Sequence, residues 1–268
     1  MSIHENRAGR INCLLIAGGV WHDIDHARLE LLKLLSEDER FRVRVFEDYE
    51  NLQAIEEADF IVSYTCNVVP SLGAQEALKA WVEKGGRWYA LHGTNSIIRL
   101  MSSGLYGTPD WAPLFVETLG SMFRSHPPIA PYQVSVADPD HPLAQGIEPF
   151  ESDDELYLMK TYGDLHVILD TEYGGKAEGF EEDEWEHARH PVFYTHKVGE
   201  GEVLYLTLGH CRHHHDMQPM LDYWPTMDRG SWELPVFYQL LRRGIQWAIE
   251  PIDKATAVAL AKARTAAE

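Results

Sequence analysis

Two histidines of this chain each follow an apolar segment and could carry acid/base chemistry. His92 lies within "GRWYALHGTNS" (86–96), where the apolar run ends in a turn, and His210 ends the segment 201–210. An imidazole exchanges protons near neutral pH and also binds metal ions. We predict that His92 and His210 are a catalytic base and acid, with metal ligation as the alternative for His92.

A short acidic segment could support these imidazoles. Asp153, Asp154 and Glu155 stand directly before the apolar pair Leu156-Tyr157. A carboxylate beside an imidazole orients the ring and stabilises its charged form. We predict that Asp154 or Glu155 has this catalytic role, and a solvated acidic turn is the alternative.

Several histidines have the chemistry of metal ligands. The segment 213–215 is a run of three histidines followed by Asp216, but consecutive residues of one element do not converge on a single ion. At most one or two of them would therefore bind a divalent metal such as Zn or Mn, together with histidines from other strand ends. No cofactor is certain. The alternative to metal binding is that these histidines form hydrogen bonds to the backbone or to a substrate. The candidate ligands are His22, His92, His126, His210, His213, His214 and His215.

Polar and aromatic residues near the same segment ends are candidates for substrate binding. Hydroxyl and amide groups follow His92 directly, and aromatic rings could stack on sugar faces. The predicted binding residues are Trp21, His22, Tyr64, Thr94, Asn95, His126, Arg212 and Trp232.

The elements that must position these residues have the pattern of an α/β protein. Apolar runs predict buried strands, a period-two segment predicts a further strand, and two amphipathic segments predict helices. This alternation favours a three-layer fold with a mostly parallel sheet and helices on both faces. Ligands of such sheets bind beyond the carboxyl ends of the strands, so the polar clusters should share one rim. The predicted strands are 11–19, 42–48, 58–66 and 87–93, and the helices 26–36 and 71–86.

The second half of the chain is less regular. It contains predicted strands at 132–138 and 166–173, a hairpin over 190–210, and a helix over 232–250. The acidic segment 180–190 is predicted to be a loop or a solvated helix.

We expect one α/β domain. The boundaries divide the chain into an N-terminal arm (1–10), the domain (11–250) and an Ala-rich C-terminal tail (251–268).

Composition excludes several classes of partner and cofactor. The chain has 23 Lys and Arg against 42 Asp and Glu, a net charge of −19, which argues against binding nucleic acid or a membrane surface. The three cysteines lack metal or redox spacing, and no dinucleotide or Walker motif is present. Neither a leader segment nor a run of transmembrane length is recognisable, so a cytoplasmic location is expected.

The sequence resembles the ThuA-like (trehalose-utilisation) family over residues 11–250. The segments that carry this resemblance include "AGGVWHD", "LKAWVEKGGRWYALHG", "DDELY" and "GEGEVLYLTLGH". The resemblance implies a flavodoxin-like fold similar to that of class I glutamine amidotransferases. The segment 211–232 is longer and more aromatic than the corresponding loop of most family members, and we expect it to form a lid.

The resemblance also bears on function. In the amidotransferases the turn at His92 presents a cysteine nucleophile, so a thiol-dependent glutaminase is not expected here. The family implies a carbohydrate-processing enzyme, such as an isomerase, lyase or hydrolase acting on a keto-sugar or glycoside. A non-catalytic sugar-binding protein and a metal-dependent hydrolase are the alternatives. A small carbohydrate is the expected partner, and exposed tryptophans such as Trp111 and Trp224 could belong to a homo-oligomer interface.

Overall fold

A nine-stranded sheet forms the centre of the molecule, in the order β2-β1-β3-β4-β13-β12-β11-β8-β9. The computed structural model describes residues 10–265, and the predicted N-terminal arm lies outside this part apart from Arg10. The neighbouring strands from β2 to β13 pair in parallel, which confirms the predicted α/β class. These parallel strands are β1 (Ile11–Gly19), β2 (Phe41–Phe46), β3 (Phe60–Cys66), β4 (Arg87–Leu91) and β13 (Gly201–Leu206).

The other end of the sheet is antiparallel, because consecutive hairpin-like connections extend it beyond β13. Its strands are β8 (Ala130–Val136), β9 (Phe150–Asp154), β11 (Leu165–Lys176) and β12 (Glu184–Val198). Two small sheets pair β7 (Ser121–Ser125) with β10 (Leu158–Thr161) and β5 (Arg99–Leu100) with β6 (Tyr106–Gly107). Strand β13 is therefore the junction between the parallel and the antiparallel half.

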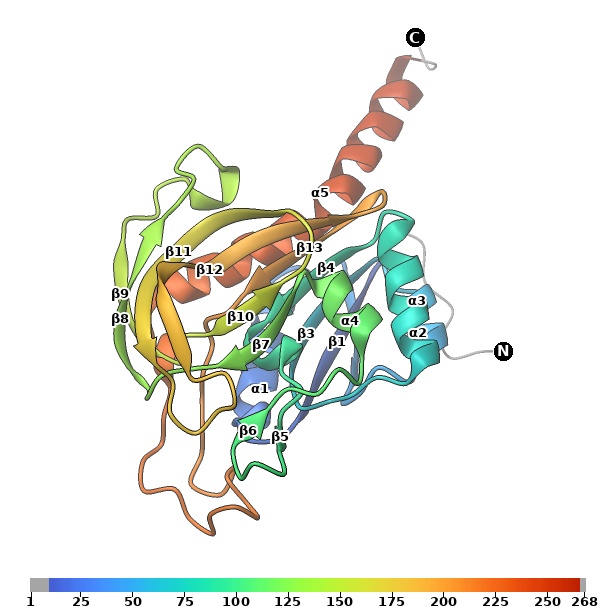
Figure 1. Ribbon diagram of the computed structural model, residues 1–268. Coiled ribbons are helices and arrows are strands. Elements are labelled where there is room, and N and C mark those ends of the chain that lie inside the picture. The colour runs from blue at the N-terminus through green and yellow to red at the C-terminus, as the bar shows by residue number, and fades with distance from the viewer. Residues whose placement is uncertain (1–9, 266–268) are drawn as a thin grey trace.

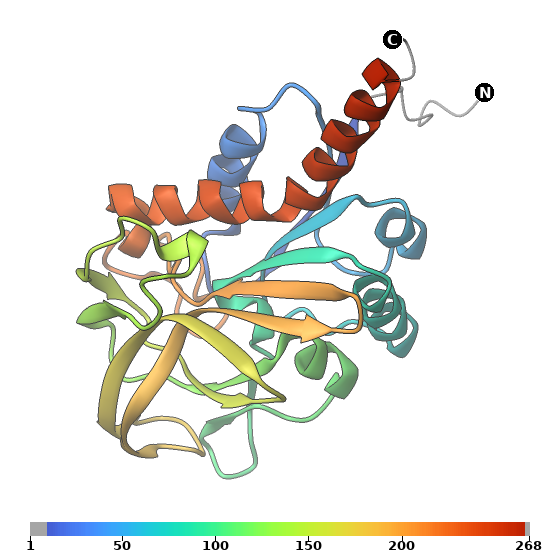
Figure 2. The same cartoon turned by 90° about the horizontal axis from the view of Figure 1, so that it is seen from above.

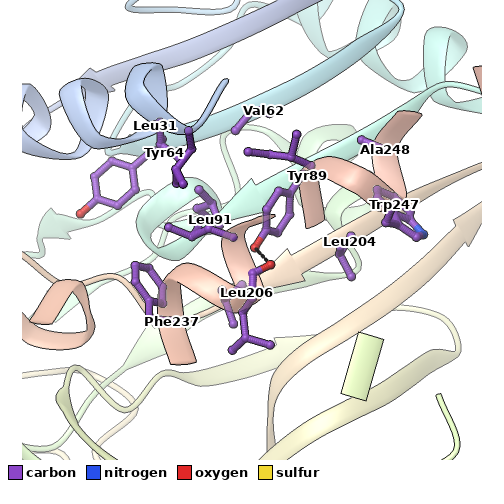
Figure 3. Close-up of a cluster of buried hydrophobic side chains, with 14 of the residues drawn as sticks. Leu31, Val62, Tyr64, Tyr89, Leu91, Leu204, Leu206, Phe237, Trp247 and Ala248 are labelled. Carbon is purple, nitrogen blue, oxygen red and sulfur yellow. Dashed lines mark hydrogen bonds between the residues drawn. The ribbon is translucent and has the colours of Figure 1, made fainter. Parts of the chain in front are cut away.

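Helices cover both faces of the parallel half, as predicted (Figures 1 and 2). Helices α1 (Ile24–Leu35) and α5 (Pro235–Thr265) lie on one face, and α2 (Leu52–Glu56), α3 (Leu72–Glu83) and α4 (Pro113–Leu119) on the other. Alternate residues of β1 enter the two cores: Leu15 packs with α1 and α5, whereas Leu14 and Ile16 pack with α2 and α3. Figure 3 shows the first core, where the Tyr89 hydroxyl donates to the carbonyl of Leu240 at 3.3 Å.

The prediction for 180–190 was wrong, because most of this acidic segment belongs to strand β12. The first half of β12 is exposed on both faces, so the apolar alternation that identifies a strand is missing there.

The C-terminal helix also differs from the prediction, since α5 continues past residue 250 to Thr265. Pro251 lies inside it and removes one helical hydrogen bond, which accounts for the bend seen in Figure 2. The end of the helix projects from the body (Figure 1). Within residues 10–265, no helix is long and apolar enough to cross a membrane.

Candidate functional site

Four side chains from distant parts of the sequence meet at the carboxyl ends of the strands. His22 follows β1, His92 follows β4, Glu155 follows β9 and His210 follows β13. One nitrogen or oxygen atom of each lies within 4.8 Å of those of the other three, and all four residues are buried. We call this group the His/Glu cluster. The sheet topology thus brings together the two histidines that were predicted to be catalytic, His92 and His210, because both lie at the carboxyl ends of strands.

The backbone around the cluster is strained. His92 has φ +44°, and two other non-glycine residues near the strand ends, Trp21 and Asn67, have φ +71° and +61°. A positive φ is unfavourable for side chains other than glycine and is typical of functional sites. Gly93 allows the tight turn, because a Cβ there would lie 2.7 Å from the carbonyl oxygen of Thr65. The turn therefore holds His92 in a fixed place.

Hydrogen bonds fix the orientation of the His92 ring. Its Nδ1 donates to the carbonyl of Thr207 at 2.7 Å. The Nε2 atom is consequently free of a proton in the neutral ring, and it lies 3.5 Å from Oε2 of Glu155 and 3.3 Å from the hydroxyl of Tyr157. His92 thus presents a lone pair to the cluster.

Two aspartates hold the His210 segment. Asp154 accepts hydrogen bonds from the backbone N–H of Gly209 at 3.0 Å and of His210 at 3.1 Å, and from the hydroxyl of Ser231. The side chain of Asp228 lies 3.7 Å from Nε2 of His210. Of the predicted pair Asp154 or Glu155, Asp154 thus bonds the backbone of this segment, and Asp228 faces the His210 ring.

Glu155 is the carboxylate at the centre of the site. Its oxygens lie 3.2 Å from Nδ1 of His210, 3.2 Å from the Arg212 guanidinium, and 4.0 Å from Nε2 of His22. His126 approaches from the outside, with Nε2 3.9 Å from Glu155. Of the two predicted carboxylates, Glu155 is therefore the one in contact with the imidazoles.

Burial and neighbouring charges set the protonation of the cluster. Burial, helped by His92, brings the pKa of His22 well below its usual range. Burial acts in the same direction on His210, but Glu155 and Asp228 outweigh it and raise this pKa to about 9. Burial opposes ionisation of Glu155, yet His210 and His126 hold its pKa well below the usual value. Without a bound ion, these shifts favour neutral His22, cationic His210 and ionised Glu155 at neutral pH, and an ion bound by His210 would displace its proton.

The cluster fits a divalent metal ion by its donor atoms. Both ring nitrogens of His22 are buried without a hydrogen bond to any residue of the described chain, 10–265, whereas those of His210 face the carboxylates of Glu155 and Asp228 at 3.2 and 3.7 Å. Buried polar atoms are rarely left without a partner unless an ion or water serves them. Imidazole and carboxylate groups suit Zn, Mn and Fe, and the Thr207 carbonyl and Asp228 stand where outer partners of metal-bound histidines are found.

A cavity of about 140 Å³ opens above the cluster. His22 and Glu155 border it, whereas the fully buried His92 and His210 do not. Thirteen residues line the cavity: Trp21, His22, Cys66, Ile98, Tyr106, Phe123, His126, Glu155, Tyr157, Phe180, Arg212, Met217 and Met220. Of the predicted binding residues, the cavity thus contains Trp21, His22, His126 and Arg212.

Four predicted binding residues lie beneath the site instead. The Tyr64 hydroxyl and the Trp232 indole N–H each donate at 2.8 Å to the carbonyl of Gly209, so both rings support the His210 turn from the core. Thr94 donates to Leu91, and the amide of Asn95 donates to the Ser121 hydroxyl. These donor groups are used inside the protein, and none of the four residues borders the cavity.

The three consecutive histidines lie in a loop above the site and outside the cluster. Nδ1 of His214 contacts the Trp224 carbonyl at 2.7 Å, and Nδ1 of His215 contacts that of Asp222 at 3.3 Å. The backbone N–H of His213 donates to Asp216. Two backbone hydrogen bonds between Arg212 and Asp228, both 2.9 Å, close the base of this loop.

Sequence reasoning missed part of the cavity wall and one outer partner. Met217 and Met220 come from the loop, and Phe180 from the segment before β12, where no periodic pattern marks them. Asp228 follows an irregular segment, and no motif or periodic pattern in the sequence marks it as a site residue. A sequence motif could have identified Tyr157, because it belongs to the same "DDELY" segment as Glu155.

A family model described as ThuA, trehalose utilisation, matches residues 12–223, more than half of the chain. A comparison with curated protein sequences gives no match.

Solved structures share the fold. A protein described as ThuA-like from Parabacteroides merdae superposes with a TM-score of 0.62 at 19% identity, covering 89% of this chain and 90% of that one. One from Bacteroides uniformis gives 0.61 at 17% identity, with 92% and 96% covered. A β-galactosidase from Rahnella sp. R3 gives 0.50 at 13% identity and covers 91% of this chain but only 32% of its own.

Proposed function

Because the chain belongs to the ThuA family, which is described as serving trehalose utilisation, we propose that it is an enzyme that processes a carbohydrate, and that its substrate is a sugar or glycoside carrying a keto group. One observation carries the proposal: three imidazoles and a carboxylate converge beneath a cavity with aromatic walls. Sugar-sized ligands bind in concave sites of this kind, where a few polar groups fix their orientation.

A keto group makes proton transfer the natural chemistry. It acidifies the neighbouring C–H bond, so epimerisation, isomerisation or elimination of a glycosidic substituent needs a base, an acid and a group that stabilises the enolate oxygen. The cavity offers both imidazole and cationic groups for these tasks, in His126 and Arg212.

We further propose that His22, His92, His210 and Glu155 hold a divalent ion, with Zn or Mn as the leading candidates. The ring nitrogens of His22, which make no hydrogen bond within residues 10–265, and the Nε2 lone pair of the neutral His92 ring support this. An ion bound there would polarise the keto oxygen of the substrate.

In this arrangement His126 is the proton-transfer group, and His92 and His210 are ligands. His126 borders the cavity, whereas His92 and His210 do not. Its Nδ1 donates to the carbonyl of Pro127 at 2.7 Å, which leaves Nε2 of the neutral ring as the base. This base would take the proton from the carbon beside the keto group, and the imidazolium would return it to the product.

Covalent catalysis by a thiol does not fit this site. The turn after β4 presents the imidazole of His92, and burial raises the pKa of the Cys66 thiol, the one cysteine that borders the cavity within residues 10–265. A glutaminase mechanism would need a thiolate.

Hydrogen exchange on substrate carbon tests the proposal without knowledge of the final product. A glucoside oxidised to a ring ketone is incubated in D₂O with tag-free protein, and NMR follows deuterium uptake beside the carbonyl. We expect exchange by the wild type, together with about one divalent ion per chain by metal analysis. His126→Gln should keep the ion and lose exchange at least about 100-fold.

His92→Gln is the matched variant, because it should lose the ion. Binding of the ketone without exchange would contradict an enzyme and leave a sugar-binding protein. Absence of a stoichiometric ion in the wild type would contradict the metal centre, and loss of the ion in His126→Gln would contradict its assigned role.

A further inference from the structure

The cavity above the His/Glu cluster has two chemically different ends. At the buried end, His22, Glu155, Tyr157 and Arg212 provide ionic and hydrogen-bonding groups, and each is at most 6% exposed. At the open end, the wall consists of half-buried side chains and the 39% exposed Met220, and these are mainly apolar apart from the imidazole of His126. We call these the polar floor and the apolar mouth. The residues of the apolar mouth are Trp21, Ile98, Tyr106, Phe180, Met217 and Met220.

The apolar mouth offers few partners for hydroxyl groups. The only side-chain N–H or O–H groups among its six residues are the indole N–H of Trp21 and the hydroxyl of Tyr106. The Tyr106 hydroxyl already lies 2.6 Å from the sulfur of Met220. A second sugar ring bound here would lose water from several hydroxyls and gain few hydrogen bonds in return, which is unfavourable.

The mouth is also assembled from separate segments. Trp21 follows β1 and packs edge-on against Tyr106 of β6, with ring centroids 6.4 Å apart, and the Tyr106 ring lies 6.4 Å from Phe180. Met217 and Met220 come from the loop closed by Arg212 and Asp228. Methionine side chains adapt to apolar ligands of different shape. This wall therefore favours an apolar group but is not specific for one shape.

We propose that the substrate is a glycoside with an apolar substituent, an aryl or alkyl aglycone. The oxidised sugar ring lies on the polar floor and the aglycone lies in the apolar mouth. This inference rests on the proposed function and specifies its substrate class. It favours aryl and alkyl glycosides over disaccharides such as trehalose, so this chain would differ in substrate from what the description of its family names.

Calorimetry with three ring-oxidised glucosides tests the apolar-aglycone assignment. The full chain is used in the presence of excess Zn²⁺ or Mn²⁺. The three ligands carry a methyl group, a phenyl group or a second glucose at the same position. We expect the phenyl glucoside to bind at least about tenfold more tightly than the other two, because it alone buries a large apolar surface.

Polar substitution of the mouth should remove this preference. Met217→Gln and Met220→Gln keep the length of the side chain, and in the double variant the phenyl and methyl glucosides should bind equally, with the methyl affinity unchanged. Met227→Gln is the control, because Met227 belongs to the same loop, is 49% exposed and does not border the cavity.

The outcomes separate the inference from the proposed function. Equal affinity for phenyl and methyl glucosides, or tighter binding of the disaccharide, overturns the apolar-aglycone assignment and leaves a keto-sugar enzyme in place. A phenyl preference that survives in the double variant also overturns it. Failure of all three ligands to bind overturns the proposed function and this inference together.

Discussion

At the scale of single residues, Asp154 and Glu155 are neighbours in sequence with different tasks in the structure. Asp154 accepts hydrogen bonds from the backbone of Gly209 and His210, whereas Glu155 contacts imidazole and guanidinium groups. The side chains of adjacent residues at the end of a strand point in different directions, so a sequence can mark the pair without distinguishing their roles.

Asp154→Asn should therefore act on stability and on the placement of His210. An amide has one oxygen to accept hydrogen bonds where the carboxylate has two, so buried N–H groups lose partners, and we expect a loss of about 1–3 kcal/mol in the free energy of unfolding. Chemical denaturation measures this. Asp153→Asn is the control, since Asp153 is exposed and should change stability by less than about 0.5 kcal/mol. Equal effects of the two substitutions would contradict this role.

Gly93→Ala should disturb the turn that presents His92. The new Cβ would lie 2.7 Å from the Thr65 carbonyl oxygen and 2.9 Å from Cβ of Cys66, both buried. Overpacking of this kind costs about 1–3 kcal/mol. Gly73→Ala in α3 meets nothing closer than 3.9 Å and should be neutral or stabilising. Thermal unfolding of the two variants compares them, and an unchanged melting temperature for Gly93→Ala would show that the turn has room to move.

The site was only partly predictable from residue types. His22, His92, His210 and Glu155 were named because their chemistry coincides with strand ends, and the parallel sheet brings three of those ends together. Tyr64 and Trp232 were also named, but their rings point into the core, where they bond the Gly209 carbonyl. Strand β3, which contains Tyr64, is buried on both faces, and the short turn that contains Trp232 has no sequence period, so neither pattern reveals which way these side chains point.

At the scale of elements, the strands with continuous apolar runs were the predictable part. β1, β3 and β4 are buried on both faces, and their sequences are accordingly continuous apolar runs. The first half of β12 and the last part of β11, which pairs with it, form an exposed arm, where charges mask the alternation. The pairing of the antiparallel half depends on contacts between distant segments, which local patterns do not encode.

The projecting end of α5 should contribute little to stability. Residues 254–259 are exposed, and up to residue 259 the last ion pair of α5 with the body is that of Asp253 with Arg40, 2.6 Å. We expect a chain that ends after Lys254 to unfold within about 2 °C of the full chain in differential scanning fluorimetry. A large loss of stability, or a change of mass in solution, would show that this segment packs against something else.

At the scale of the whole molecule, ion binding should stabilise the fold. The ligands come from both halves of the sheet, so an ion bound to the folded chain raises its free energy of unfolding by about 2.7 kcal/mol at 100 times the dissociation constant. This corresponds to a rise of about 5 °C or more in melting temperature.

Titration of Zn²⁺ or Mn²⁺ during thermal unfolding measures this rise. His210→Gln should abolish it. His166→Gln, an exposed histidine paired with Asp138 on the far side of the antiparallel half, should leave it intact. A rise that persists in His210→Gln would place the ion elsewhere.

The wide spacing of the cluster along the chain has a consequence for folding. Its four members lie at positions 22, 92, 155 and 210, and no two belong to one local segment. Closing such distant contacts is slow, because the entropy of the intervening loops is lost before the contacts form. The cluster can be completed only after β13 has joined β4 and β9 has been carried to the same rim. During synthesis, an ion captured by all four ligands would therefore mark a chain in which the two halves of the sheet have already come together.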